Sequence, residues 1–230
     1  MGTPLTPPPS QEQLAEPRHA PEPTLRRLPA YHRFLKRLET QGRAVVSCTH
    51  IAADLALDPT QVRKDLAVTG IVGRPKVGYA VPALIAAIEH FLGWDNTTEA
   101  FLVGAGSLGT ALLGYEGFRE HGLQIVAAFD VDDVKIGQQI HGKRVLPLRK
   151  LSSLARRMHV RLGIITTPAG AAQEVADLMV EGGIKGIWNF APASLKLPAG
   201  VIVENMQLSS SLAVLSNKLH GALRHEAAAD

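Results

Sequence analysis

Three glycines in the stretch FLVGAGSLG have the spacing G-x-G-x-x-G and directly follow a hydrophobic run that is typical of a buried strand. Between a strand and a helix, the first glycine permits a tight turn and the second lets a pyrophosphate approach the backbone. The third lets the helix pack closely on the strand. The helix N-terminus adds N–H groups and partial positive charge. We therefore expect a dinucleotide to bind here, through Gly104, Ala105, Gly106, Ser107, Leu108 and Gly109.

An acidic residue, Asp130, ends the next hydrophobic run, QIVAAFD, about twenty residues after the glycines. At that place a carboxylate accepts hydrogen bonds from the hydroxyls of the adenine-side ribose, and its charge repels a 2′-phosphate. The pattern therefore favours NADH and NAD⁺ over their phosphorylated counterparts. Asp132 and Asp133 compete for the same role, and Asp130 can also be read as a plain turn residue at the end of a strand.

Two later segments follow predicted strands, where ligands bind in doubly wound sheets. In the first, Thr167 and Pro168 precede a helix, and Thr167 is expected to cap that helix while its hydroxyl or amide faces the ligand. In the second, Asn189 and Phe190 are expected to line a nicotinamide pocket. Ordinary cap and turn chemistry is the alternative interpretation of both segments.

A group that could perform chemistry on the bound dinucleotide is missing from the pattern. Hydride transfer needs a substrate pocket and usually a proton donor beside the nicotinamide. The nine histidines lie in no catalytic motif, and the single cysteine, Cys48, allows neither an internal disulfide nor a thiol-based zinc site. We expect no catalytic residue, no metal site and no enzymatic activity.

The elements around the glycines alternate between strands and helices. Strands are predicted at 101–104, 124–130, 162–167, 186–190 and 201–206, with helices at 107–115 and 168–182. This order predicts an α/β fold with a parallel, doubly wound sheet. After the last strand, Leu208, Leu212, Leu215 and Leu219 recur at helical steps. That helix packs either on its own sheet or on a partner subunit.

The N-terminal part of the chain is strongly basic. Residues 24–82 hold ten Lys and Arg against four acids, a net charge of +6, whereas the whole chain carries +3. Such a block is typical of a module that binds a polyanion. A helix from Leu28 to Gly42 is followed by a short helix capped by Ser47 or Thr49, and Asp58-Pro59 then starts another helix that stops at Gly70.

These proportions, with a connection of about three residues, predict a helix-turn-helix. Gln61, Arg63 and Lys64 lie on the outer side of its second helix. The next segment, IVGRPKVGYAV, predicts a hairpin with a basic tip at Gly73-Arg74-Pro75-Lys76, which completes a winged helix.

The chain is therefore expected to divide into a disordered tail (1–23), a winged-helix domain (24–82), a connecting helix (83–95), a nucleotide-binding domain (96–206), a C-terminal dimerisation helix (207–222) and a second tail (223–230). Its apolar runs are shorter than the roughly 18 residues needed to cross a bilayer. The first residues also lack the pattern of a signal peptide. We expect a cytoplasmic protein with no membrane partner.

Several motifs in the same order resemble the Rex family of redox-sensing transcriptional repressors. They are RRLPAYHRFLKRL, QVRKDL with VGY, the glycine motif with FDVD, TTPAGAAQ and GIKGIWNFAPA, spread from about Arg26 to Leu219. The resemblance implies a homodimer that binds palindromic operator DNA through its winged helices and NADH or NAD⁺ through Rossmann-type domains. It also implies release from DNA by NADH and exchange of the C-terminal helix between subunits.

The resemblance also assigns roles to residues. Gln61, Arg63 and Lys64 would lie in the major groove or on its phosphates, Arg74 and Lys76 near the minor groove, and Arg27 and Tyr31 at the DNA backbone. Three places depart from the family. Ala67-Val68-Thr69 replaces Ser-Tyr-Phe, Pro75-Lys76 replaces a basic-Gly pair, and Gln207 stands where an Asp is common. The resemblance implies that the residue at this last place couples a tyrosine, here Tyr115, to the state of the cofactor.

Two other functions fit parts of the same pattern. One is a small NAD-dependent oxidoreductase with an accessory basic domain, and the other is a CoA-binding protein of similar outline. Steady turnover of NADH with a carbonyl compound would indicate the first, and competition between CoA and NADH would indicate the second.

Overall fold

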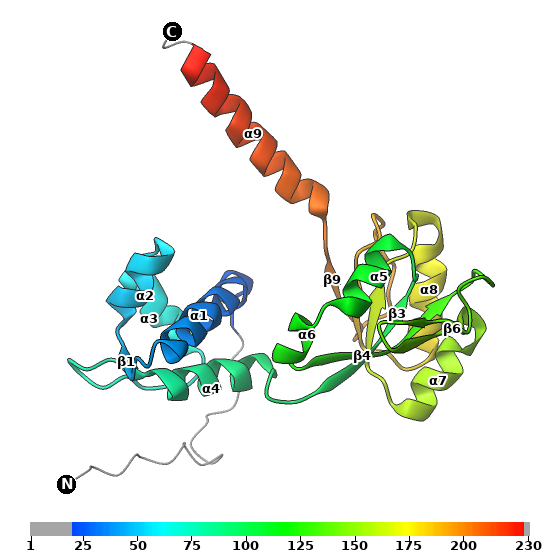
Figure 1. Ribbon diagram of the computed structural model, residues 1–230, viewed down its shortest axis with the longest axis horizontal. Coiled ribbons are helices and arrows are strands. Elements are labelled where there is room, and N and C mark those ends of the chain that lie inside the picture. The colour runs from blue at the N-terminus through cyan, green and yellow to red at the C-terminus, as the bar shows by residue number, and fades with distance from the viewer. Residues whose placement is uncertain (1–19, 228–230) are drawn as a thin grey trace. The chain divides into compact units, whose positions relative to one another are not determined.

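The computed structural model describes residues 20–227, without the side chains of 208 and 225–227. The chain forms two compact units, and the boundary between them in the sequence falls between Asn96 and Thr97 (Figure 1). Most of the expected tail, 1–19, lies outside the described residues. Its last part is not a tail, because helix α1 (Glu22–Thr40) begins there. Pro23 stands in the first helical turn, where proline is well tolerated, and Thr24 is buried.

The first unit contains the predicted helix-turn-helix. Helices α2 (Cys48–Leu55) and α3 (Pro59–Ala67) are separated by three residues. Ser47, not Thr49, caps α2 by accepting a hydrogen bond from the backbone N–H of His50. Asp58 caps α3 by accepting from two backbone N–H groups, and Pro59 opens the helix, as predicted. The α1 residues Leu28 and Leu35 pack against α2 and α3 in one core.

The wing differs from the prediction in its strand pairing. Strand β2 (Tyr79–Ala80) pairs antiparallel with β1 (Val45–Val46), which precedes the helix-turn-helix. The expected hairpin is reduced to one antiparallel bridge between Arg74 and Gly78. Gly78 permits the pairing with β1, because a Cβ atom there would lie 2.2 Å from the carbonyl oxygen of Val46.

The sequence predicted a connecting helix at residues 83–95, but helix α4 (Val81–Leu92) belongs to the first unit. Its side chains at Val81, Leu84 and Ile88 are completely buried in the core of the first unit. Because these apolar positions recur at helical spacing, they pack on α1 and leave only a short segment after Gly93 to join the two units.

The second unit has the predicted doubly wound sheet. Its seven strands lie in the order β5-β6-β4-β3-β7-β8-β9, and all pairings are parallel except that of β5 with β6. Strand order reverses between β3 and β7, which is where such sheets bind ligands. The bounds are β3 (Thr98–Val103), β4 (Leu123–Asp130), β5 (Gln139–Ile140), β6 (Lys143–Pro147), β7 (Leu162–Ile165), β8 (Gly186–Asn189) and β9 (Ile202–Asn205).

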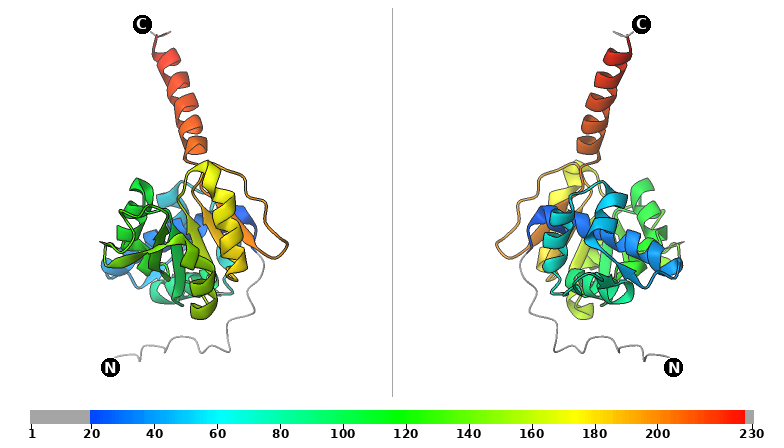
Figure 2. Two further views of the ribbon diagram at one scale, coloured as in Figure 1. Left: turned by 90° about the vertical axis from the view of Figure 1, so that its right-hand side faces the viewer. Right: turned by 90° about the vertical axis from the view of Figure 1, so that its left-hand side faces the viewer.

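Helices cover the two faces of this sheet unequally. Helices α7 (Leu151–Met158) and α8 (Ala169–Glu181) pack on one face, while α5 (Ser107–Gly114) and the short α6 (Gly117–Glu120) lie on the other (Figure 2). Strands β5 and β6 and helix α7 were not predicted. The last helix, α9 (Leu208–Ala227), extends into the expected tail at 223–230. Among the described residues, no helix is both long and apolar enough to span a bilayer.

Gly109 provides a direct test of how α5 packs on β3. A Cβ atom at Gly109 would lie 1.9 Å from the carbonyl oxygen of Gly104, which is backbone and cannot rotate away. Gly109→Ala is therefore expected to lower the free energy of unfolding by about 3 kcal/mol. Gly170→Ala is the matched control, because nothing lies within 4 Å of its Cβ position at the start of α8. The control should be neutral or slightly stabilising in urea unfolding. Equal stability of the two variants would contradict this packing.

Candidate functional site

The glycine loop lies at the carboxyl end of β3, beside the end of β7. Gly104 has a φ of +102°, in the left-handed region that favours glycine. The hydroxyl of Thr166 donates to the carbonyl oxygen of Gly104 at 2.7 Å and fixes the loop to β7. Gly106 is the N-cap of α5, and no atom lies within 4 Å of where its Cβ would be. The loop therefore leaves its backbone open to a ligand at Gly106.

Asp130 fastens the end of β4 to this loop. Its Oδ2 accepts from the backbone N–H of Ala105 at 2.8 Å and from the ammonium of Lys135 at 3.3 Å. Its Oδ1 accepts from the backbone N–H groups of Val131 and Asp132 at 2.8 and 3.0 Å. Burial alone would raise the pKa of Asp130, but the hydrogen bonds outweigh it and the pKa lies below the ordinary value. The carboxylate is therefore ionised and placed at the mouth of the loop.

Two exposed apolar residues beside Asp130 were missed by the sequence analysis. Val131 and Val134 are 74% and 77% exposed, although both are large hydrophobic side chains. They follow the carboxylate that was expected to hold the adenine-side ribose. Apolar side chains at this place suit the flat face of an adenine ring. A search for hydrophobic residues within the FDVDDVK segment would have found them.

Thr167 does not cap α8, contrary to the prediction. The N-cap of α8 is Pro168, and no side chain accepts a hydrogen bond from the first turn. The Thr167 hydroxyl is instead buried without a hydrogen-bond partner among the described residues. A buried hydroxyl without a partner costs about 1–3 kcal/mol. Since Thr167 borders Gly104, a ligand on the loop could supply the missing bond.

Asn189 is committed to the protein itself. It is completely buried, its amide nitrogen donates to the carbonyl of Ala193 and to the side chain of Asn205, and its oxygen accepts from the backbone N–H of Ala191. These three bonds order the segment after β8 and attach it to β9. The amide therefore shapes the edge of the sheet and is not a free ligand group.

Phe190 and Tyr115 lie at opposite ends of a row of aromatic rings. Neighbouring ring centroids are 4.9 Å apart for Phe190 and Trp188, 5.6 Å for Trp188 and Phe118, and 4.8 Å for Phe118 and Tyr115. Tyr115 is 57% exposed at the end of α5. The row places both predicted residues on the α5 side of the sheet.

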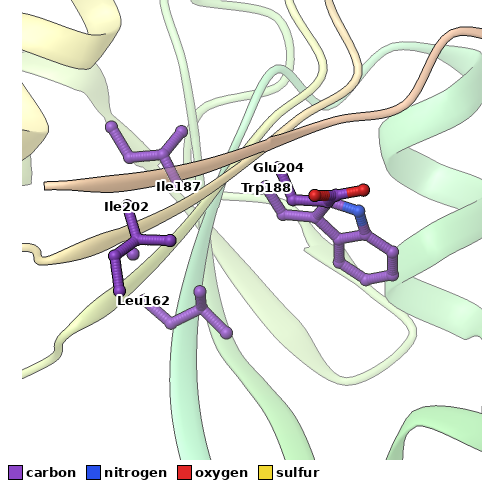
Figure 3. A pocket seen from close by; sticks show the side chains of 6 residues that line it. Leu162, Ile187, Trp188, Ile202 and Glu204 are labelled. Atoms are coloured by element: carbon purple, nitrogen blue, oxygen red, sulfur yellow. The ribbon is translucent and has the colours of Figure 1, made fainter. Parts of the chain in front are cut away.

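An apolar groove of about 250 Å³ continues this face onto β7, β8 and β9 (Figure 3). Leu162, Trp188, Ile202 and Glu204 are among the residues that line it. Phe118 of α6 packs on Trp188, whereas Ile202 is 75% exposed. The described residues contain no cluster of three or more His, Cys, Asp or Glu side chains that could hold a metal ion.

In the first unit, Asp65 is the centre of a buried cluster that joins α3 to α1. Its carboxylate accepts two hydrogen bonds from the guanidinium of Arg27, at 2.6 and 2.8 Å, and one each from Thr24, Tyr31 and Gln61. Burial would raise the pKa of Asp65, but these bonds bring it down to about 2. Asp65 is therefore ionised and holds α3 against α1.

This cluster engages three of the residues expected at the DNA, and it overturns the role of one of them, Tyr31. Tyr31 is completely buried and donates its hydroxyl to Asp65, so the prediction that it contacts the DNA backbone was wrong. Burial and the neighbouring Asp65 raise the pKa of its hydroxyl well above the ordinary value. Arg27 is held by Asp65, and its pKa is raised by that carboxylate. Gln61 donates its amide to Asp65, but it stays partly exposed on α3.

The other predicted contacts lie on the surface. Arg63 and Lys64 are exposed on α3, and Arg74 and Lys76 are exposed on the turn that follows. Lys76 has a φ of +63°, so it stands at the tip of that turn. Of the three residues that depart from the family pattern after RKDL, Ala67 is exposed, Val68 packs on the core and Thr69 is buried.

Breaking the Asp65 cluster should destabilise the first unit. Asp65→Asn removes the charge that pairs with Arg27, and removing one partner of a buried pair costs about 3–5 kcal/mol. Asp54→Asn is the control, because its pair with Arg37 is solvent-exposed and worth about 0–1 kcal/mol. Urea unfolding followed by circular dichroism measures both changes.

The difference between wild type and Asp65→Asn should depend on pH. The folded pKa of about 2 lies below the ordinary 3.8, so the stabilisation is fully present above about pH 4 and is lost as the pH falls through 2. The two proteins should therefore approach each other in stability between pH 4 and 2. A difference that stays constant over that range would contradict the assignment.

Each of the two units matches a known protein-family model. Residues 95–193 match the family model described as CoA binding domain, and residues 19–67 match the model described as putative DNA-binding protein N-terminus. The chain is 50% identical over 193 residues to the redox-sensing transcriptional repressor Rex of Treponema denticola, covering 84% of this chain and 92% of that protein. It is 44% identical to the Rex of Bacteroides thetaiotaomicron, covering 87% of this chain and 91% of that protein.

Two solved structures are similar along most of the chain. RSP in complex with β-NAD⁺ and operator DNA has a TM-score of 0.85 and 32% identity, covering 91% of this chain and 96% of that chain. RSP in complex with β-NADH has a TM-score of 0.81 and 32% identity, covering 90% of this chain and 97% of that chain. The resemblance seen in the sequence motifs is thereby confirmed. This chain belongs to the Rex family of redox-sensing transcriptional repressors.

Proposed function

We propose that this chain is a repressor that binds operator DNA with its first unit, binds NADH or NAD⁺ with its second, and is released from DNA by NADH. The observation that carries the proposal is the pairing, in one chain, of an open glycine loop at the switch point of the sheet with a cationic helix α3 in a separate unit. RSP, which is similar to it, has been crystallised with NAD⁺ and operator DNA and with NADH.

The residues around the loop fit a dinucleotide. Gly106 leaves its backbone open, and the N-terminus of α5 points unpaired N–H groups toward the pyrophosphate. The buried hydroxyl of Thr167 lacks a partner within the part of the chain that the structure describes. Val131 and Val134 offer an apolar surface to the adenine, and Asp130 is ionised beside the ribose position. These residues would hold the dinucleotide, and its oxidation state would be the signal that the protein senses.

The same residues argue against catalysis. Around the loop, Thr166 donates its hydroxyl to β3, and Asn189 donates its amide to the loop after β8. Hydrogen bonds lower the pKa of Asp130 and keep it ionised. None of these groups is poised to exchange a proton with a substrate. We therefore propose that the chain senses the dinucleotide without converting it. Since operator DNA is its target, we place the protein in the cytoplasm.

The first unit presents cations to DNA. Arg63 and Lys64 on α3 and Arg74 and Lys76 on the turn are exposed, while Asp65 anchors α3 from behind. Contacts from Lys and Arg to phosphates supply affinity, whereas edges of bases in the major groove supply sequence choice. Gln61 is the residue on α3 suited to reading a base, since its amide oxygen is not used by Asp65.

A homodimer would cover apolar side chains that the second unit leaves exposed. Leu212, Leu215, Leu219 and Leu223 form an apolar stripe on α9 and are 53–63% exposed. The groove is most open at Ile202, while Leu162 and Trp188 are partly buried. Contiguous exposed apolar side chains often mark a surface that another protein covers. We propose that α9 of a second copy covers the groove, which exchanges the C-terminal helices between subunits.

Dimerisation makes the two ligands interdependent. A palindromic operator requires two α3 helices about 34 Å apart, one turn of DNA. If NADH favours a dimer with a different spacing, NADH and DNA must weaken each other's binding by the same factor. The linkage needs no reaction, only a difference in how the two nucleotides bind the two arrangements.

NADH should lower the affinity of the protein for operator DNA by about tenfold or more, which is within the usual range of such couplings. NAD⁺ should have a much smaller effect. Fluorescence anisotropy with a labelled duplex, chosen by selection from random sequences, measures both. Equal DNA affinity with and without saturating NADH would remove the proposed regulation.

The proposed dimer has its own test. Leu215→Glu places a charge in the apolar stripe of α9 and should convert the dimer into a monomer in size-exclusion chromatography with light scattering. Asn217→Glu adds the same charge on the opposite side of the helix and should leave the dimer intact. A monomeric wild type, or a dimeric Leu215→Glu variant, would contradict the assignment.

A CoA-binding function is the second candidate, because the family model over residues 95–193 carries that description. CoA and NADH share an adenosine and a pyrophosphate, but CoA carries a phosphate on its ribose. Failure of CoA to displace NADH from the protein would exclude this candidate.

A further inference from the structure

The ribose edge of the proposed nucleotide site contains an ion pair that the sequence analysis did not consider. The ammonium of Lys135 lies 3.3 Å from Oδ2 of Asp130 and 3.6 Å from Oδ2 of Asp132. Its side chain is 34% exposed, so the group is neither sealed in the core nor free in solvent. Lys135 therefore bridges two carboxylates beside the glycine loop.

In this arrangement all acceptor positions of the Asp130 carboxylate are occupied, so a ribose hydroxyl cannot donate to it. A carboxylate offers about four lone-pair positions, and Asp130 accepts from three backbone N–H groups and from Lys135. The three backbone donors belong to fixed segments at 2.8–3.0 Å, whereas the contact with Lys135 is the longest of the four. Lys135 is therefore the partner that can yield when a ribose hydroxyl arrives.

The charges at this edge decide which nucleotides fit. Asp130 and Asp132 carry two negative charges and Lys135 one positive charge, so the trio is net negative. A ribose phosphate carries about −1.5 to −2 charges at pH 7. Both carboxylates repel it, and the displaced ammonium of Lys135 is the group in this trio that can attract it.

We propose that Lys135 determines how strongly this site distinguishes a plain ribose from a phosphorylated one, an inference that rests on the proposed binding of NAD(H). With NADH, Lys135 leaves Oδ2 of Asp130, stays near Asp132, and frees an acceptor for the ribose hydroxyl. With NADPH, Lys135 is the counter-charge of the 2′-phosphate and provides whatever affinity the site retains for it.

The test compares NADH and NADPH in equilibrium titrations of nucleotide fluorescence with the full-length protein. Lys135→Met should weaken NADPH binding about tenfold, since a charge-assisted hydrogen bond to the phosphate is lost. The same variant should tighten NADH binding about twofold to threefold, because the acceptor on Asp130 is already free. Lys135→Arg keeps the charge and should restore affinity for NADPH. The control Lys150→Met removes an exposed cation at the start of α7 and should change neither affinity.

The outcomes separate this inference from the function on which it rests. If wild type binds NADH and the NADH-to-NADPH preference rises more than tenfold in Lys135→Met only, the inference is supported. If wild type binds NADH but both affinities of Lys135→Met move together or stay within threefold, the inference is wrong and the proposed function stands. If wild type does not bind NADH, the proposed function itself fails. Thermal unfolding of each variant without nucleotide checks that the fold is intact.

Discussion

One face of the sheet in the second unit is only partly covered, and this constraint determines the rest of the proposed assembly. Helices α5 and α6 cover β3 and β4, but on β7, β8 and β9 Leu162 and Trp188 are only partly buried and Ile202 is exposed. The same chain carries an exposed leucine stripe on α9. Because removing apolar surface from water is the largest favourable contribution to association, two copies can each supply what the other lacks. The proposed dimer would bring together two α3 helices whose spacing can change.

Each unit has one buried carboxylate that holds the segment proposed to bind a ligand in place. Asp65 holds α3 against α1 through Arg27, and Asp130 holds the glycine loop through the N–H of Ala105. In both cases hydrogen bonds outweigh burial and keep the acid ionised. Networks of this kind fix geometry more than they add stability. Neither binding surface has to be built from a disordered loop when its ligand arrives.

The sequence predicted what local signals encode. The glycine spacing, the Asp58-Pro59 helix start and the strand that ends at Asp130 depend on neighbouring residues, and the structure contains all three features. Tyr31 was misplaced because its partner, Asp65, lies 34 positions away. The partner of β2, the burial of α4 and the free hydroxyl of Thr167 also depend on distant contacts. Strand β5 was missed because it has only two residues, and β6 because it begins with two charged residues and ends at a proline. Lys135 was missed because its role depends on which groups surround Asp130.

The central claim is that nucleotide and DNA compete through the shape of one dimer. Calorimetric titration of NADH into the free protein and into the protein saturated with operator duplex tests it most directly, because thermodynamic linkage requires the effect to be reciprocal. The account predicts that operator DNA weakens NADH binding by the same factor by which NADH weakens DNA binding. An NADH affinity that is identical in the two titrations would contradict it.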